Sequence, residues 1–181
     1  MPLLSLRGFL PRGLALLLLV CSAAAAPPRA VVHPIASRLP LIRSAGYVFL
    51  GTVMDVERLT PSQPNAVATM RITFRVEQAV QGVRAGQTLE IHEWAGLWLA
   101  GERYRKGERV ALFLYHPSRV GLTSPVGGPL GRFAVDSAGQ IILQPFQVPA
   151  LSANPRWTAR MRSKLRLSPQ ELIQVVRAAR E

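Results

Sequence analysis

The sequence predicts a mainly β protein, a small antiparallel barrel or sandwich that follows a signal peptide and is followed by a C-terminal helix. Three observations predict it. A short apolar run opens the chain, several strand-like segments separated by turn residues occupy its middle, and a capped amphipathic segment ends it. With 181 residues, 49% of them hydrophobic and 18% charged, the chain has room for one ordinary domain plus appendages and is too apolar to be disordered.

Residues 1–25 have the three regions of a secretory signal peptide: two arginines, an apolar run over 14–21 and a stretch of small residues. The run is shorter than the ~20 residues that cross a bilayer. The small residues Ala23 and Ala25 form an A-x-A pair, which predicts cleavage after Ala25. We therefore expect export through the inner membrane to the periplasm or the medium, with no transmembrane span in the mature chain. A lipoprotein anchored through Cys21 and an uncleaved anchor are the two alternatives.

Cys21 is the one cysteine of the chain, and it lies in the predicted signal peptide. The mature domain would then enter an oxidising compartment without a disulfide, so its stability must come from packing. Removal of Cys21 with the signal peptide would also exclude catalysis by a thiolate and zinc bound by cysteine. The sequence predicts no cofactor.

The middle of the chain contains six segments with the composition and spacing of strands: residues 47–57, 66–77, 88–94, 109–115, 131–135 and 141–143. The second alternates most strictly, with Phe74 on its apolar side and Arg75 on its polar side. The fourth is apolar on both faces and is expected in the centre of a sheet. Residues 136–140 form a predicted turn in which Gly139 is free to take positive φ.

The end of the chain predicts a helix over residues 168–181. Ser168 is the N-cap, Pro169 takes the first helical position, and Glu171 completes a capping box. An earlier helix over 156–167 is suggested by apolar residues spaced by four. The expected order is a signal peptide (1–25), a Pro- and Arg-containing extended leader (26–45), a β-barrel domain (46–145), a basic segment with helical spacing (146–167) and the C-terminal helix (168–181).

Four pieces of the β region, taken in order, resemble a known group of proteins: residues 46–53, 73–77 with Gln81 and Gly82 after them, 107–114 and 131–133. The group consists of uncharacterised secreted bacterial small β-barrel proteins whose core is similar to the OB-like fold of tissue inhibitors of metalloproteinases. The resemblance covers roughly residues 45–145 and implies an OB-like antiparallel barrel of about six strands. It carries no site across, because those inhibitors place an amino-terminal cysteine on the protease zinc and the expected mature chain has none.

Catalytic and metal-binding patterns are scarce, and we predict neither a catalytic nor a metal site. The pair His92-Glu93 lacks the second histidine of an HExxH motif. Strand parity places His92 on the side away from Leu89 and Ile91, so we interpret it as facing solvent. A metal site of His92, Glu93 and His116 would require their strands to be adjacent.

Residues 94–106 bring aromatic and basic side chains together in a short segment between strands. Such a cluster is able to stack on and hydrogen-bond a partner. The alternative is that the segment closes one end of the barrel as core, because large aromatic side chains are usually buried. The candidate partner-binding residues are Trp94, Trp98, Arg103, Tyr104 and Arg105.

The net charge of +12 comes from 22 basic and 10 acidic residues and is concentrated on the flanks of the β region. Either the basic segment lies on an anionic surface, or its apolar residues pack on the barrel while its bases face water. Arg-rich genome composition would produce the same excess. The candidate anionic-surface residues are Arg156, Arg160, Arg162, Lys164 and Arg166.

Three hypotheses follow. The first is a secreted, non-enzymatic β-barrel binding module whose partner is a protein or an envelope component. The second is a cationic envelope-associated protein that docks on anionic lipid or polysaccharide. The third is an exported hydrolase or metal protein with a site that the sequence does not reveal. Arginine beside aromatics also suits single-stranded nucleic acid, but export argues against that partner.

Overall fold

The computed structural model describes residues 41–61, 66–99, 103–151 and 154–180. All of them belong to one of the two compact units of the chain, His33–Glu181. The predicted signal peptide and residues 26–40 of the predicted leader lie outside the described residues. Within the described part of the chain, no helix is both long and apolar enough to cross a membrane.

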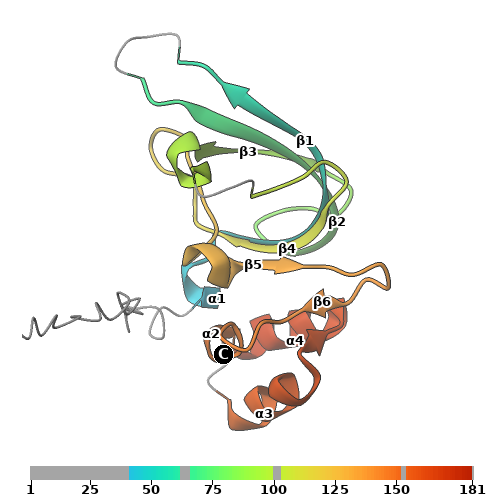
Figure 1. The fold of residues 1–181 in the computed structure, drawn as a ribbon. Coiled ribbons are helices and arrows are strands. Elements are labelled where there is room, and N and C mark those ends of the chain that lie inside the picture. Colours follow the sequence, from blue (N-terminus) through green and yellow to red (C-terminus); the bar gives the residue numbers. More distant parts are fainter. Residues whose placement is uncertain (1–40, 62–65, 100–102, 152–153, 181) are drawn as a thin grey trace, which may run out of the picture. The chain divides into compact units, whose positions relative to one another are not determined.

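A five-stranded antiparallel sheet in the order β3-β2-β1-β4-β5 organises the fold (Figure 1). Its strands are β1 (Tyr47–Leu59), β2 (Thr69–Gln81), β3 (Thr88–Trp94), β4 (Arg109–Leu114) and β5 (Arg132–Ala134). The central strand β1 pairs with β2 on one side and with β4 on the other. The prediction of a mainly β, antiparallel fold is confirmed.

Among the described residues the strands do not close into a barrel. The segment after β4 instead meets the sheet at single bridges, one from Leu122 to His92 on β3 and one from Pro125 to Leu114 on β4. The predicted sixth strand, β6 (Ile141–Ile142), lies outside the main sheet and pairs with β7 (Arg166–Leu167). Its partner β7 lies at the far end of the basic segment, and a local residue pattern does not reveal such a distant pairing. The sequence pattern therefore assigned residues 141–143 to the barrel.

The central strands are apolar on both faces because two core clusters use alternate residues of the same strand. On β4, Phe113 belongs to one cluster, and its neighbours Leu112 and Leu114 belong to the other. Successive residues of a strand point to opposite faces of the sheet, so both faces are covered. The cluster with Phe113 also contains the buried apolar residues of the helices, whereas the cluster with Leu112 is built from the sheet and the segment around Tyr104.

The helices are α1 (Leu41–Ser44), α2 (Val148–Leu151), α3 (Pro155–Lys164) and α4 (Pro169–Ala178), and two 3-10 turns are η2 (Ala95–Trp98) and η3 (Gly128–Gly131). The predicted capping box is present: the Ser168 hydroxyl accepts from the Glu171 amide at 3.2 Å, and the Glu171 carboxylate accepts from the Ser168 amide at 2.9 Å. The earlier helix is also present and ends at Lys164, because Leu165 turns to positive φ (49°).

One prediction at the start of the β domain is wrong. Residues 41–44 were expected in an extended leader, but they form α1, and both Leu41 and Ile42 are buried in the first core cluster. Four residues are too few to form a helix by propensity. Packing of the two apolar side chains therefore holds this turn in place.

Candidate functional site

The most unusual buried group is the carboxylate of Glu93 on β3. Leu89, Ile91 and Glu93 share one face of the strand, and Glu93 is 0% exposed. Its Oε2 accepts from the indole Nε1 of Trp98 at 3.1 Å, and its Oε1 accepts from the hydroxyl of Tyr104 at 3.2 Å. Burial raises the pKa of Glu93, while the Trp98 hydrogen bond and the charge of Arg103 act in the opposite direction.

Tyr104 connects this carboxylate to basic residues nearer the surface. Its ring packs edge-on against Phe74, with the centroids 5.4 Å apart. The guanidinium carbon of Arg132 lies 5.0 Å from the centre of the Tyr104 ring, a cation–π distance. Arg132 also donates from Nη2 to Oε1 of Glu108 at 2.5 Å. These contacts fix the direction in which the Arg132 guanidinium points.

Beside Arg132 lies a hollow of about 510 Å³, which we call the basic hollow. Of the residues that the structure describes, four cations and one carboxylate line it: Arg103, Arg105, Lys106, Arg132 and Glu108. Glu108 accepts from Arg132 and from the backbone amide of Arg105 at 3.0 Å, so its charge is turned toward the protein's own donors. The lining has an excess of positive charge, which makes the hollow suited to an anionic group.

The structure divides the predicted partner-binding residues into two sets. Arg103 and Arg105 line the basic hollow, and Trp94 is 48% exposed on β3. Tyr104 is 2% exposed, and Trp98 packs against the same core cluster. Burial removes Tyr104 from the predicted partner-binding set, because its hydroxyl and ring are used by Glu93, Phe74 and Arg132. Tyr104 and Trp98 fit the alternative prediction, in which the aromatic side chains of this segment pack as core.

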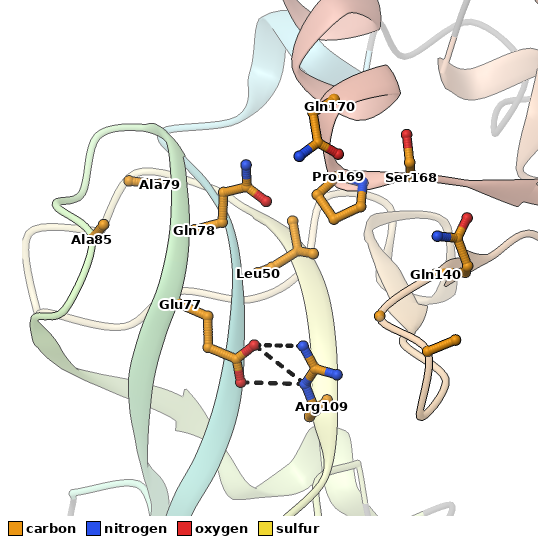
Figure 2. Close-up of a pocket in the computed structure, with 12 residues that line it drawn as sticks. Leu50, Glu77, Gln78, Ala79, Ala85, Arg109, Gln140, Ser168, Pro169 and Gln170 are labelled. Carbon is orange, nitrogen blue, oxygen red and sulfur yellow. Dashed lines mark hydrogen bonds and ion pairs between the residues drawn. The ribbon is translucent and has the colours of Figure 1, made fainter.

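A second hollow of about 540 Å³ lies between the sheet, the turn over 136–140 and the start of α4 (Figure 2). We call it the glutamine groove, because Gln78, Gln140 and Gln170 line it. At one side of the groove Glu77 and Arg109 form an ion pair, with Arg109 Nη2 2.6 Å from Glu77 Oε2. The hydrogen bond from Arg109 lowers the pKa of Glu77, and burial opposes that effect.

The basic helix α3 turns its apolar side inward. Met161 is fully buried in the first core cluster, and Trp157 and Leu165 pack against that cluster. Of the five predicted anionic-surface residues, Arg160 is paired with Glu171 at 2.6 Å and Arg166 lies 3.9 Å from Asp136. The other three are exposed and form no ion pair with a described residue: Arg156, Arg162 and Lys164.

The three residues of the conceivable metal site, His92, Glu93 and His116, are not grouped together. His92 pairs with Glu90 at 3.0 Å, whereas Glu93 points into the core on the opposite face of β3. The ring of His116 lies 6.3 Å from that of Tyr47. In the described part of the chain, no three His, Cys, Asp or Glu side chains are grouped as metal ligands. His33 lies outside it.

Sequence reasoning missed two members of this site. Glu93 has the same strand parity as Leu89 and Ile91, so an acid at an apolar position of the 88–94 pattern was a usable signal. Arg132 had no such signal, because only the pairing of β5 with β4 brings it beside residues 103–108.

No family model matches this chain. The searches of curated proteins and of solved structures also find no match.

Proposed function

We propose that this chain is an exported, non-enzymatic binding module that recognises an anionic group of a protein or an envelope component through the basic hollow. One observation carries the proposal: among the described residues, four cations from two separate parts of the chain and one carboxylate line the hollow, and that carboxylate already has donors of its own. Opposite charge at such a site raises both the rate and the specificity of association.

The site is preorganised, which reduces the ordering cost of binding. Arg132 is held between the Tyr104 ring and Glu108. Arg103 donates from Nε to the carbonyl of Leu97 at 3.0 Å, so a second guanidinium is also oriented. Two fixed guanidinium groups suit a carboxylate or a phosphate, because each of these anions presents two oxygens that accept paired hydrogen bonds from one guanidinium.

We further propose that the β domain is an open variant of the OB-like barrel of the secreted proteins and inhibitors that it resembles. The order β3-β2-β1-β4 supports this, since one meander is joined to a later strand through β1. The bridges from Leu122 to β3 and from Pro125 to β4 also support it, because the segment between these two residues reaches from β4 to the edge strand β3 at the opposite end of the sheet.

The test uses a fluorescent hexaglutamate peptide as the anionic probe, with anisotropy read at low ionic strength. The double variant Arg105→Gln, Lys106→Gln removes two charges from the hollow. The control double variant Arg84→Gln, Arg177→Gln removes two exposed charges elsewhere. We expect the hollow variant to bind about tenfold more weakly and the control to change about twofold or less.

Equal losses in both doubles would mean that the probe follows net charge and not the hollow, which would refute the proposal. The melting temperature of each variant checks that the fold is intact. Because the tested residues are exposed, we expect it to be unchanged.

A second candidate function is docking on an anionic lipid or polysaccharide surface through α3. The observation that favours it is the row of exposed, unpaired bases on a helix with no acidic residue in its first turn. The inward packing of Trp157 and Met161 supports contact by charge rather than by insertion.

A further inference from the structure

Three glutamine side chains line the glutamine groove, each from a different element. Gln78 comes from β2, Gln140 from the turn before β6 and Gln170 from the first turn of α4. None of these amides has a hydrogen-bond partner among the residues that the structure describes. Figure 2 shows Gln78 and Gln170 extending toward the same space above Leu50. Each amide is free to donate and to accept.

The strand that forms one wall of the groove is distorted at this place. β1 and β2 pair as Leu50 with Gln78 and then Gly51 with Val76, so Glu77 is an extra residue in β2. A regular strand would turn Glu77 and Gln78 to opposite faces. The bulge instead allows Glu77, Gln78 and Ala79 all to line the groove. Bulges of this kind re-aim side chains and are common next to functional sites.

The other walls of the groove are also held in place. The backbone N–H of Gln140 donates to Oδ1 of Asp136 at 2.8 Å, which fixes the turn. Ser168 is fixed by the capping box of α4, and Arg109 is held by Glu77 and contacts the carbonyl of Asp136 at 3.5 Å. The groove is thus formed without a ligand, and its volume falls in the usual range of ligand sites, about 300–1,000 Å³.

The chemistry of the lining selects the class of ligand. Glu77 and Arg109 neutralise each other, and the other lining residues carry no charge, so an anion gains nothing here. None of the twelve lining residues is aromatic, so a sugar ring has no surface on which to stack. What remains is a set of amides and a serine beside small apolar side chains, which matches the alternating donors and acceptors of a peptide main chain.

We propose that the glutamine groove is a second binding site, separate from the basic hollow, that takes an extended, uncharged peptide segment. The amides of Gln78, Gln140 and Gln170 bond its main chain, and Leu50 and the alanines of the wall contact its side chains. The ion pair of Glu77 and Arg109 orients the wall.

The experiment is a ¹⁵N–¹H NMR titration of the full chain with the capped peptide Ac-Ala-Ala-Ala-Ala-NH₂. We expect the side-chain amide signals of the three glutamines to shift and to saturate at millimolar peptide. Maltose at the same concentration is expected to leave them in place. If the peptide shifts none of them, or if maltose alone shifts them, the proposal is wrong.

Variants on one helix provide the matched comparison. Gln170→Ala removes a lining amide, and Gln174→Ala removes an exposed amide on α4 that does not line the groove. We expect the first to weaken peptide binding on the order of fivefold and the second to have no effect. Equal behaviour of the two variants would overturn the assignment. The hexaglutamate probe reports the basic hollow separately, so the two sites fail or succeed independently.

Discussion

The hydroxyl of Tyr104 donates to Oε1 of Glu93 across 3.2 Å, and this bond joins the loop before β4 to the buried face of β3. The guanidinium of Arg132 lies over the ring of the same tyrosine. The Glu93 carboxylate in the core and the Arg132 guanidinium at the basic hollow therefore both contact the Tyr104 side chain. Any change at Glu93 is expected to reach the hollow through the position of Tyr104.

Glu93→Gln should change how stability depends on pH. Burial raises the pKa of Glu93 in the folded protein above the ordinary value of 4.5. The unfolded chain then releases the proton first, so the stability is fully present below about pH 4.5 and declines as pH rises toward the folded-state pKa. Glutamine does not titrate, so urea unfolding should show the wild-type protein losing stability relative to Glu93→Gln over that rise.

Glu90→Gln is the control for this measurement, since Glu90 lies on the outward face of β3 and pairs with His92. Glu90→Gln keeps Glu93, so it should lose stability with rising pH as the wild-type protein does. If Glu90→Gln instead removed that decline as Glu93→Gln does, the effect would come from surface charge and the assignment to Glu93 would be wrong.

Phe74→Ala and Arg75→Ala test the register of β2. Phe74 is fully buried and its ring packs against Phe49 and Tyr104, so its loss should cost about 3–5 kcal/mol of unfolding free energy. Arg75 is exposed, and its loss should stay within about 0.5 kcal/mol. Similar costs for the two in urea melts would be incompatible with the observed faces of the strand.

Gly82→Ala and Gly86→Ala separate backbone strain from close approach. Both glycines have positive φ, 71° and 80°. A Cβ at Gly82 would lie 2.3 Å from the carbonyl oxygen of Gly46, whereas a Cβ at Gly86 would meet nothing within 4 Å. Gly86→Ala should therefore lower the free energy of unfolding by on the order of 1 kcal/mol, which is the cost of placing alanine at positive φ. Gly82→Ala should lower it by clearly more, because its Cβ would also clash with the Gly46 carbonyl oxygen. Thermal or urea unfolding of the pair compares them directly.

Docking through α3 predicts binding to anionic vesicles that depends on salt. Each base near such a surface contributes about 1 kcal/mol and is screened over a Debye length, so binding at low ionic strength should be mostly lost in ~0.5 M salt. Replacing Arg156, Arg162 and Lys164 by glutamine should abolish it without changing the melting temperature, because these bases are unpaired and exposed.

The control for this test replaces three exposed bases outside α3: Arg75, Arg84 and Arg177. Vesicle binding that survives the α3 replacements, or that falls equally in the control, would exclude α3 as the docking element.

The sequence predicted those features that neighbouring residues determine. Ser168 and Glu171 stand three positions apart and form the capping box that begins α4, and Phe74 and Arg75 lie on the faces that the alternation indicated. Long-range pairing decided the rest. The partner of β6 comes from residues 166–167, and the bulge at Glu77 depends on its pairing with β1.

The candidate site divides in the same way. Arg103 and Arg105 were identified from composition within one segment, and both line the basic hollow. Arg132 reaches that hollow only because β5 pairs with β4, and Gln170 reaches the groove only because α4 lies against it. The sequence left open whether Tyr104 binds a partner or packs as core, because composition does not distinguish a loop that packs inward from one that faces solvent.

The central place of β1 has a consequence for how the chain folds. Leu59 pairs with Thr69, ten positions later, whereas Tyr47 pairs with Leu114, more than sixty positions later. The β1–β2–β3 meander can therefore form on the microsecond scale of hairpins, but β4 joins only after a long loop has closed. In that interval the side of β1 that β4 will cover is an open strand edge of a partly folded chain. We expect refolding to compete with aggregation, with the yield falling as protein concentration rises, and light scattering during dilution from urea would measure that competition.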